Sequence, residues 1–163
     1  MENTIQLHDK KFRIMIPAEQ IDKAVDEICE QGYSNIFFIG CGGTWAHTLP
    51  MQYWFDTTTS KIETHCVIAA EFLAMGHKRF NKDSVCVFST RTGTTPEIIE
   101  AAKYCQEHGA RTVMYVSNDN TPATEYADYK FFSFAEDDVL CEAIYTYQTV
   151  SYTHLTLPTI LRV

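Results

Sequence analysis

Residues 84–109 read SVCVFSTRTGTTPEIIEAAKYCQEHG, and this stretch decides the fold. Its first part, Ser84–Phe88, is short and almost continuously apolar, which is typical of a strand buried on both faces. Pro96 fits the first turn of a helix, and Gly109 fits its end. Between them, apolar side chains recur at the spacing of one helix face: Ile98, Ile99, Ala102 and Cys105. The stretch therefore predicts a buried strand, a polar turn and a helix.

The same alternation of strand and helix extends in both directions, although the first fifteen residues hold no strong signal. Further strands are expected at Asn35–Gly40, Ile62–Val67, Thr112–Val116 and Lys130–Phe134. Helices are expected at Pro17–Gly32, at Thr44–Phe55 with Pro50 as a kink or late start, at Ala69–Met75, at Thr121–Ala127, and from Asp137 or Asp138 through Tyr147. Strands that alternate with helices form βαβ units. The sequence therefore predicts an α/β domain with a doubly wound, five-stranded parallel sheet flanked by helices.

Sheets of this kind bind ligands outside the carboxyl ends of their strands, at the point where the strand order reverses. Two turns that follow expected strands are therefore the candidate site. The first turn is GCGGT, residues 40–44, and the second turn is STRTGTTPE, residues 89–97.

The first turn combines glycines with a hydroxyl at an expected helix start. Gly42 and Gly43 would let the backbone approach a ligand closely, and the N–H groups beside Thr44 would point at it. The alternative is a tight turn that needs glycine only for its backbone conformation. A dinucleotide site is not favoured, because no third glycine completes the G-x-G-x-x-G pattern and Glu63 lies inside a strand rather than at its end.

The second turn carries five hydroxyls, one guanidinium and one glycine. Hydroxyls and free N–H groups are the donors that a phosphate monoester needs, and the helix dipole favours its charge. Arg91 could add a bidentate contact. The alternative is that these residues only cap the helix. A cap needs one hydroxyl, whereas this turn carries five, among them those of Thr90, Thr92 and Thr95. No Walker P-loop occurs in the sequence, so a nucleoside triphosphatase is not favoured.

Composition excludes several classes of protein. The net charge of −8 argues against a nucleic-acid or anionic membrane surface. The N-terminal residues have no apolar core typical of a signal peptide and no apolar run is long enough to span a bilayer, so a cytoplasmic protein is expected. The six cysteines form no C-x-x-C pair, and His65, His77 and His108 show no metal-ligand spacing. We therefore expect reduced thiols, no metal and no cofactor.

Four stretches resemble, in order, a SIS (sugar isomerase) domain with its flavodoxin-like fold. They are NIFFIGCGGTWAHTLPMQYWFD, AAEFL, VCVFSTRTGTTPEIIEAAKYCQEHGARTVMYV and TPATEYADYKFF. The pattern looks closest to the fructosamine-6-phosphate deglycases, in which two such turns flank the phosphorylated sugar. The second turn is the specific part of this resemblance, whereas the first turn alone would not identify the family.

The resemblance implies roles for individual residues. Thr44, Thr90, Thr92 and Thr95 match positions where the family places phosphate-binding hydroxyls. Arg91 stands where family members vary.

Catalytic residues are less defined than the phosphate contacts. Glu71 resembles a family glutamate near the sugar, and His47 lies close enough to the first turn to reach the sugar. Both are candidates only, because the family's catalytic G-E-x-x-H-G-P segment belongs to a second domain and does not occur here.

The last residues depart from this pattern. Residues 150–159, VSYTHLTLPT, are the translation of a sequence that resembles a transposase adapter used in DNA sequencing libraries. We therefore expect an N-terminal segment with one helix at 1–34, a SIS domain at 35–149 as the first of two in the parent protein, and a non-native tail at 150–163.

The resemblance implies the N-terminal half of a fructosamine-6-phosphate deglycase or sugar-phosphate isomerase, from a parent that forms homo-oligomers. Its ligand would be a phosphorylated sugar or fructosamine 6-phosphate. The alternative is a non-catalytic module that senses sugar phosphates, but such regulators carry a helix-turn-helix ahead of the SIS domain, for which residues 1–34 are too few. An aminotransferase would need a glutaminase domain upstream.

Overall fold

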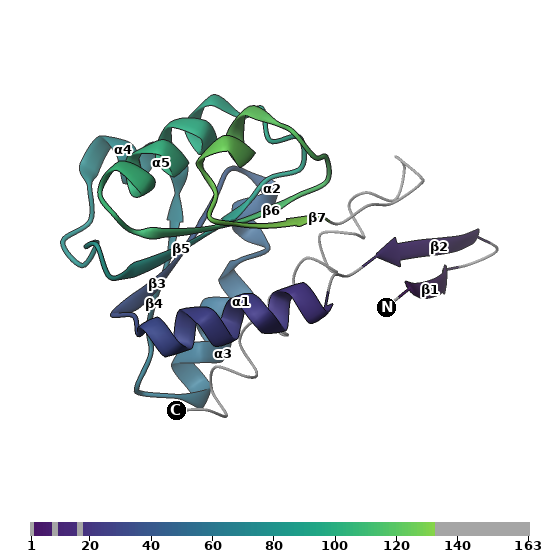
Figure 1. Cartoon of the computed structure of the whole chain (residues 1–163), viewed down its shortest axis with the longest axis horizontal. Coiled ribbons are helices and arrows are strands. Elements are labelled where there is room, and N and C mark those ends of the chain that lie inside the picture. Colours follow the sequence, from purple (N-terminus) through teal and green to yellow (C-terminus); the bar gives the residue numbers. More distant parts are fainter. Residues whose placement is uncertain (1, 8–9, 16–17, 133–163) are drawn as a thin grey trace.

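The computed structural model describes residues 2–7, 10–15 and 18–132, which form two sheets (Figure 1). A small antiparallel sheet pairs β1 (Glu2–Leu7) with β2 (Lys10–Met15). The main sheet has five parallel strands in the order β4-β3-β5-β6-β7. Their bounds are Asn35–Gly40 for β3, Glu63–Ile68 for β4, Ser84–Ser89 for β5, Arg111–Val116 for β6 and Tyr129–Phe132 for β7. The predicted α/β fold is confirmed.

The connections between the parallel strands are helical. The helices are α1 (Ala18–Gln31), α2 (Gly43–Ala46), α3 (Leu49–Thr58), α4 (Ala69–Met75), α5 (Pro96–Glu107) and a 3-10 helix η1 (Pro122–Tyr126). Among these described helices, none is long and apolar enough to cross a membrane.

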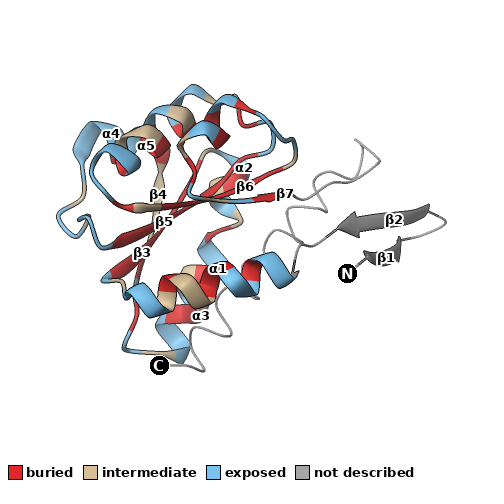
Figure 2. Cartoon of the chain, in the orientation of Figure 1, coloured by how far each residue is buried: buried red, intermediate tan, exposed pale blue. Residues whose placement is uncertain are grey.

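Both faces of the main sheet are covered, as the apolar strands require (Figure 2). Alternate residues of β3 illustrate the period of two: Ile36 and Phe38 pack with α1 and α3, whereas Phe37 and Ile39 pack with α4 and α5. Phe37 and Ile39 are fully buried. The fold is therefore a three-layer sandwich in which β3 and β5 form the centre.

The strand order reverses between these two central strands. From β3 the chain crosses to β4 at one edge, and from β5 it continues through β6 to β7 at the other. The turns after β3 and β5 therefore leave the same edge of the sheet at the switch point, where ligands of this fold class bind.

Three local details of the structure go beyond the predictions. The helix expected at Thr44–Phe55 is split into α2 and α3, and Pro50 lies in the first turn of α3, so its role is a late helix start. The segment at Thr121–Ala127 is a 3-10 helix rather than an α-helix. The hairpin β1–β2 was not predicted. Its alternating apolar residues, such as Ile5 and Leu7, were the available signal.

Two predictions fall outside the described residues. The helix expected to begin at Asp137 or Asp138 and the tail at 150–163 both lie beyond residue 132. They remain predictions from the sequence.

Candidate phosphate-binding site

The first turn folds tightly back onto α2. A Cβ atom on Gly40 would lie 2.6 Å from the backbone nitrogen of Trp45, so only glycine fits there. The hydroxyl of Thr44 donates to the carbonyl of Cys41 over 2.9 Å and accepts from the N–H of Cys41 over 3.2 Å. The Thr44 side chain is buried. To donate to a ligand, this hydroxyl would have to leave the Cys41 carbonyl.

The two candidate catalytic residues differ in how they contact the first turn. His47 follows α2, is half-buried, and bonds through Nδ1 to the carbonyl of Gly43 within that turn. Glu71 is an exposed side chain in the first turn of α4. The structure thus ties His47 to the first turn and leaves the Glu71 carboxylate open to solvent.

The half-buried thiol of Cys41 shows that three segments meet beside the first turn. Burial raises the pKa of this thiol, and the nearby carboxylate of Glu97 raises it further. A hydrogen bond to the backbone of Ala69 acts in the opposite direction. Because Glu97 lies in the first turn of α5 and Ala69 begins α4, the turns after β3, β4 and β5 converge on one region.

The second turn is organised by its own threonines. The buried Thr90 hydroxyl accepts from the N–H of Gly93 over 3.3 Å. The hydroxyls of Thr92 and Thr94 lie 2.8 Å apart, and Thr92 also accepts from the N–H of Thr94 over 3.3 Å. Both of these side chains are exposed. The turn therefore presents two adjacent hydroxyls to solvent rather than burying them.

The N-terminus of α5 lies beside these hydroxyls with its capping position only partly used. Thr95 occupies the N-cap, and its carbonyl accepts from Ile98 and Ile99, each over 3.1 Å. Its side chain makes no capping hydrogen bond. Capping therefore does not account for the Thr95 hydroxyl. Pro96 has no N–H and the N–H of Ile98 bonds to Thr95, so Glu97 carries the one N–H at the start of α5 that has no partner within the helix.

The predicted residues thus fall into two groups. Thr92, Thr95 and the exposed Arg91 lie together on the second turn, at the positive end of a helix of 12 residues. Thr90 and Thr44 are buried, and their hydroxyls serve hydrogen bonds within the turns. Exposed donors around a helix N-terminus form a place where a phosphate dianion can be bound.

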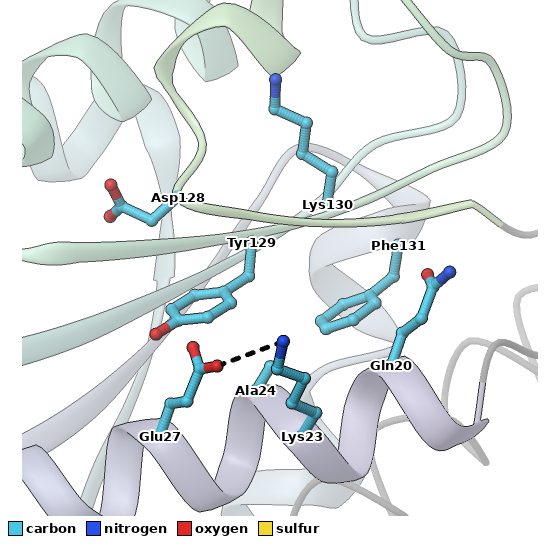
Figure 3. Close-up of a pocket in the computed structure, with 8 residues that line it drawn as sticks. All are labelled: Gln20, Lys23, Ala24, Glu27, Asp128, Tyr129, Lys130 and Phe131. Atoms are coloured by element: carbon cyan, nitrogen blue, oxygen red, sulfur yellow. Dashed lines mark ion pairs between the residues drawn. The ribbon is translucent and has the colours of Figure 1, made fainter.

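A second concave region lies between α1 and β7 (Figure 3). It encloses about 230 Å³, and none of its lining residues belongs to either turn. The rings of Tyr129 and Phe131 face α1, whereas Lys130 points away from it. Lys23 is already paired with Glu27 over 3.8 Å. This hollow offers mixed charges and no group of converging donors, so the second turn remains the candidate site.

Thiols and histidines of the described residues show no sign of metal chemistry. Five cysteines are free thiols, at positions 29, 41, 66, 86 and 105. Within the same part of the chain, no group of three or more His, Cys, Asp or Glu side chains could hold a metal ion.

The sequence was compared with models of protein families. The model described as SIS domain matches residues 31–157, which include every strand of the main sheet and both turns. This chain belongs to the SIS domain family. The matched range begins four residues before the predicted boundary at Asn35 and extends past Thr149.

Three relatives illustrate what this SIS domain resembles. The fructosamine deglycase FrlB of Bacillus subtilis (strain 168) is 28% identical over 95 residues, which are 58% of this chain and 29% of that protein. A crystal structure described as a phosphosugar isomerase from Bacillus subtilis superposes with a TM-score of 0.75 at 25% identity, over 85% of this chain and 42% of that one. The NanR protein of Vibrio vulnificus, complexed with ManNAc-6P, gives a TM-score of 0.68 at 13% identity, over 91% and 55%. The last likeness shows the fold alone. The chain spans less than a third of the curated deglycase and less than half of the isomerase.

Sequence reasoning missed two contributors to this region of the SIS domain. Cys41 was read only as one of six dispersed thiols, and no local pattern marks its approach to Glu97. Thr121 was read only as a helix start, whereas the structure packs it against Gly93 of the second turn. Both contacts join segments that are far apart in the sequence.

Proposed function

We propose that this SIS domain binds a phosphorylated sugar, with the phosphate at the second turn and the N-terminus of α5. One observation carries the proposal: Thr95 occupies the N-cap of α5 without using its hydroxyl, beside the exposed hydroxyls of Thr92 and Thr94. Hydroxyl donors and the N–H of Glu97 at the helix start suit a phosphate dianion, whose charge is also favoured by the helix dipole. Arg91 adds a cation on the same turn.

We propose further that the sugar is fructosamine 6-phosphate or a related phosphosugar, and that the chain is the first SIS domain of a deglycase or isomerase. The likeness to FrlB and to phosphosugar isomerases supports this proposal. The sugar would extend from the second turn toward the first, because both turns leave the same edge of the sheet. His47 and Glu71 are the side chains proposed for proton transfer near the sugar carbons.

Titration calorimetry of the full chain tests the binding proposal. Fructose 6-phosphate should bind and fructose should not, because the proposed site offers donors for a phosphate rather than for a neutral sugar. Inorganic phosphate is the second ligand, and it should bind more weakly at the same site and compete with fructose 6-phosphate. Equal affinities for fructose and fructose 6-phosphate would contradict a phosphate site.

A turnover assay tests the proposed relation to a two-domain enzyme. The sequence has no G-E-x-x-H-G-P segment, which the resemblance assigns to a second domain. We therefore expect binding without deglycase or isomerase activity from the purified chain. Product formation from fructosamine 6-phosphate, above that of a heat-treated control, would show that this chain carries its own catalytic groups.

A further inference from the structure

Backbone hydrogen bonds attach the second turn to β6, to the loop that follows β6 and to η1. Thr90 donates its N–H to the carbonyl of Tyr115 over 3.0 Å, and Ser117 donates to the carbonyl of Arg91 over 3.1 Å. Ala123 donates to the carbonyl of Gly93 over 3.0 Å. The backbone of the turn is thus held by residues that lie outside it.

The side chain of Thr121 lies against Gly93 of the second turn. A Cβ atom built on Gly93 would lie 2.0 Å from Oγ1 and 2.5 Å from Cβ of Thr121. Gly93 has φ of +66°, in the left-handed region that favours glycine. Thr121 therefore fills the space beside the Cα atom of Gly93, at the residue where the second turn reverses direction.

Thr121 is buried, with 8% of its surface exposed. Its hydroxyl has no hydrogen-bond partner among the described residues. A buried hydroxyl without a partner is unfavourable. The contact of Thr121 with the second turn is therefore the packing of its side chain against Gly93.

We propose that Thr121 is a positioning residue of the phosphate site: it packs against Gly93 and holds the second turn in the conformation that presents Thr92 and Thr95 to a ligand. This inference rests on the proposed phosphate-binding function. A turn that is held in one conformation binds more tightly, because the apparent affinity scales with the population of the binding-competent state. Loss of the contact should lower that population without removing any phosphate donor.

The chain offers a matched control for this proposal. Thr64 is also buried, with 4% of its surface exposed, and its hydroxyl also has no partner among the described residues. It lies in β4 opposite Ile36, near the amino end of the sheet and away from both turns. Thr121→Ala and Thr64→Ala remove the same atoms from a buried site, so both should lower stability in urea melts.

Affinity for fructose 6-phosphate then separates the two variants. Thr121→Ala should weaken binding by about fivefold, whereas Thr64→Ala should bind as the wild-type chain does. Thr121→Val replaces the hydroxyl by a methyl group of similar size and so keeps the shape of the side chain beside Gly93. Its affinity should therefore stay within about twofold of wild type. Thr121→Ser keeps Oγ1, the atom of Thr121 that lies nearest to the space beside Gly93, so it should also bind within about twofold of wild type. If Thr121→Ala does not fold, Thr121→Val and Thr121→Ser still test the proposal. Wild-type affinity in Thr121→Ala, or a loss in Thr121→Val or Thr121→Ser as large as the one expected for Thr121→Ala, would overturn the proposal.

Amide hydrogen exchange provides a measurement that needs no ligand. Thr121→Ala should accelerate exchange in peptides that cover residues 90–95 by about fivefold, with Thr64→Ala unchanged there. Unchanged exchange in Thr121→Ala would overturn the positioning role. If the wild-type chain fails to bind any phosphate ligand, the proposed function is wrong, while the exchange experiment still decides whether Thr121 holds the turn.

Discussion

The carboxylate of Asp128 accepts two hydrogen bonds from Thr112, one from its backbone N–H over 2.7 Å and one from its hydroxyl over 2.9 Å. In return, the N–H of Asp128 lies 3.0 Å from both the hydroxyl and the carbonyl oxygen of Thr112. Thr112 is fully buried near the start of β6, and Asp128 immediately precedes β7. This reciprocal pair fixes the last described strand to the rest of the sheet.

Replacing Asp128 should therefore destabilise the domain. In Asp128→Ala the buried N–H of Thr112 loses its acceptor, which should lower the free energy of unfolding by about 1–3 kcal/mol. The Thr112 hydroxyl still has the carbonyl of Tyr126 as an acceptor, at 2.8 Å. Urea melts measure the change. Glu125→Ala, which removes an exposed carboxylate from the neighbouring η1, should leave the midpoint unchanged. A similar midpoint for both variants would mean that the pair contributes little.

Thr92→Val should weaken phosphosugar binding while leaving the fold intact. Its exposed hydroxyl is proposed to donate to the phosphate, and a hydrogen bond to a charged group contributes about 1.5–3 kcal/mol. Calorimetry with fructose 6-phosphate should show this loss. Thr57→Val is the control, because Thr57 is an exposed threonine on α3 whose hydroxyl bonds only to backbone carbonyls. Unchanged affinity in Thr92→Val would remove this residue from the site.

The glycines of the first turn should respond differently to the same added methyl group. In Gly40→Ala the new Cβ would meet the backbone of Trp45 at 2.6 Å, so the free energy of unfolding should fall by more than about 1 kcal/mol. In Gly43→Ala nothing lies within 4 Å, and alanine favours the helix that begins there. Gly43→Ala should therefore be neutral or slightly stabilising. Equal destabilisation in thermal melts would contradict this account of the turn.

Stability should depend on pH through His65. Burial lowers the pKa of this imidazole from 6.5, the neighbouring His77 and Arg79 lower it further, and the carboxylates of Glu63 and Asp56 oppose them. The unfolded chain therefore takes up a proton at a higher pH than the folded chain does. The stabilisation from keeping His65 neutral is therefore complete above about pH 6.5. The free energy of unfolding should fall as the pH drops from there toward the folded pKa.

His65→Gln should reduce this dependence. Urea melts at about pH 7.5 and about pH 5.5 should differ less for His65→Gln than for the wild-type chain. His108→Gln, which changes an exposed histidine directly after α5, controls for the loss of an imidazole. An equal pH dependence in wild type and His65→Gln would assign the effect to other groups.

Deletion of residues 150–163 should leave the domain as stable as before. The tail follows neither helical nor strand periodicity in the sequence, so its apolar residues are not expected to add core. If they were buried, deletion should cost about 1.5–3 kcal/mol for each large aliphatic side chain. A urea melt of residues 1–149 beside the full chain decides between the two, and a sharply lower midpoint would make the tail part of the fold.

Local patterns were sufficient for most of the fold. The apolar runs that became β3 and β5 are too short for core helices and are bounded by glycine-rich or hydroxyl-rich turns, so strand and turn could be read directly. Pro96 and Gly109 marked the limits of α5 in the same way, because both act on the backbone at their own position. The hairpin β1–β2 was missed, since two short strands depend on their pairing rather than on local propensity.

For the candidate site, too, some features follow from local sequence and others from tertiary packing. The sequence by itself determined which donors are available, because Thr90, Arg91, Thr92 and Thr95 follow one another on a single turn. Only the tertiary structure decided their use: Thr90 turns inward to the N–H of Gly93, while Thr92 and Thr95 remain outside. The approach of Thr121 to Gly93 joins turns that follow two different strands. Such contacts depend on strand order and packing, which no local spacing encodes.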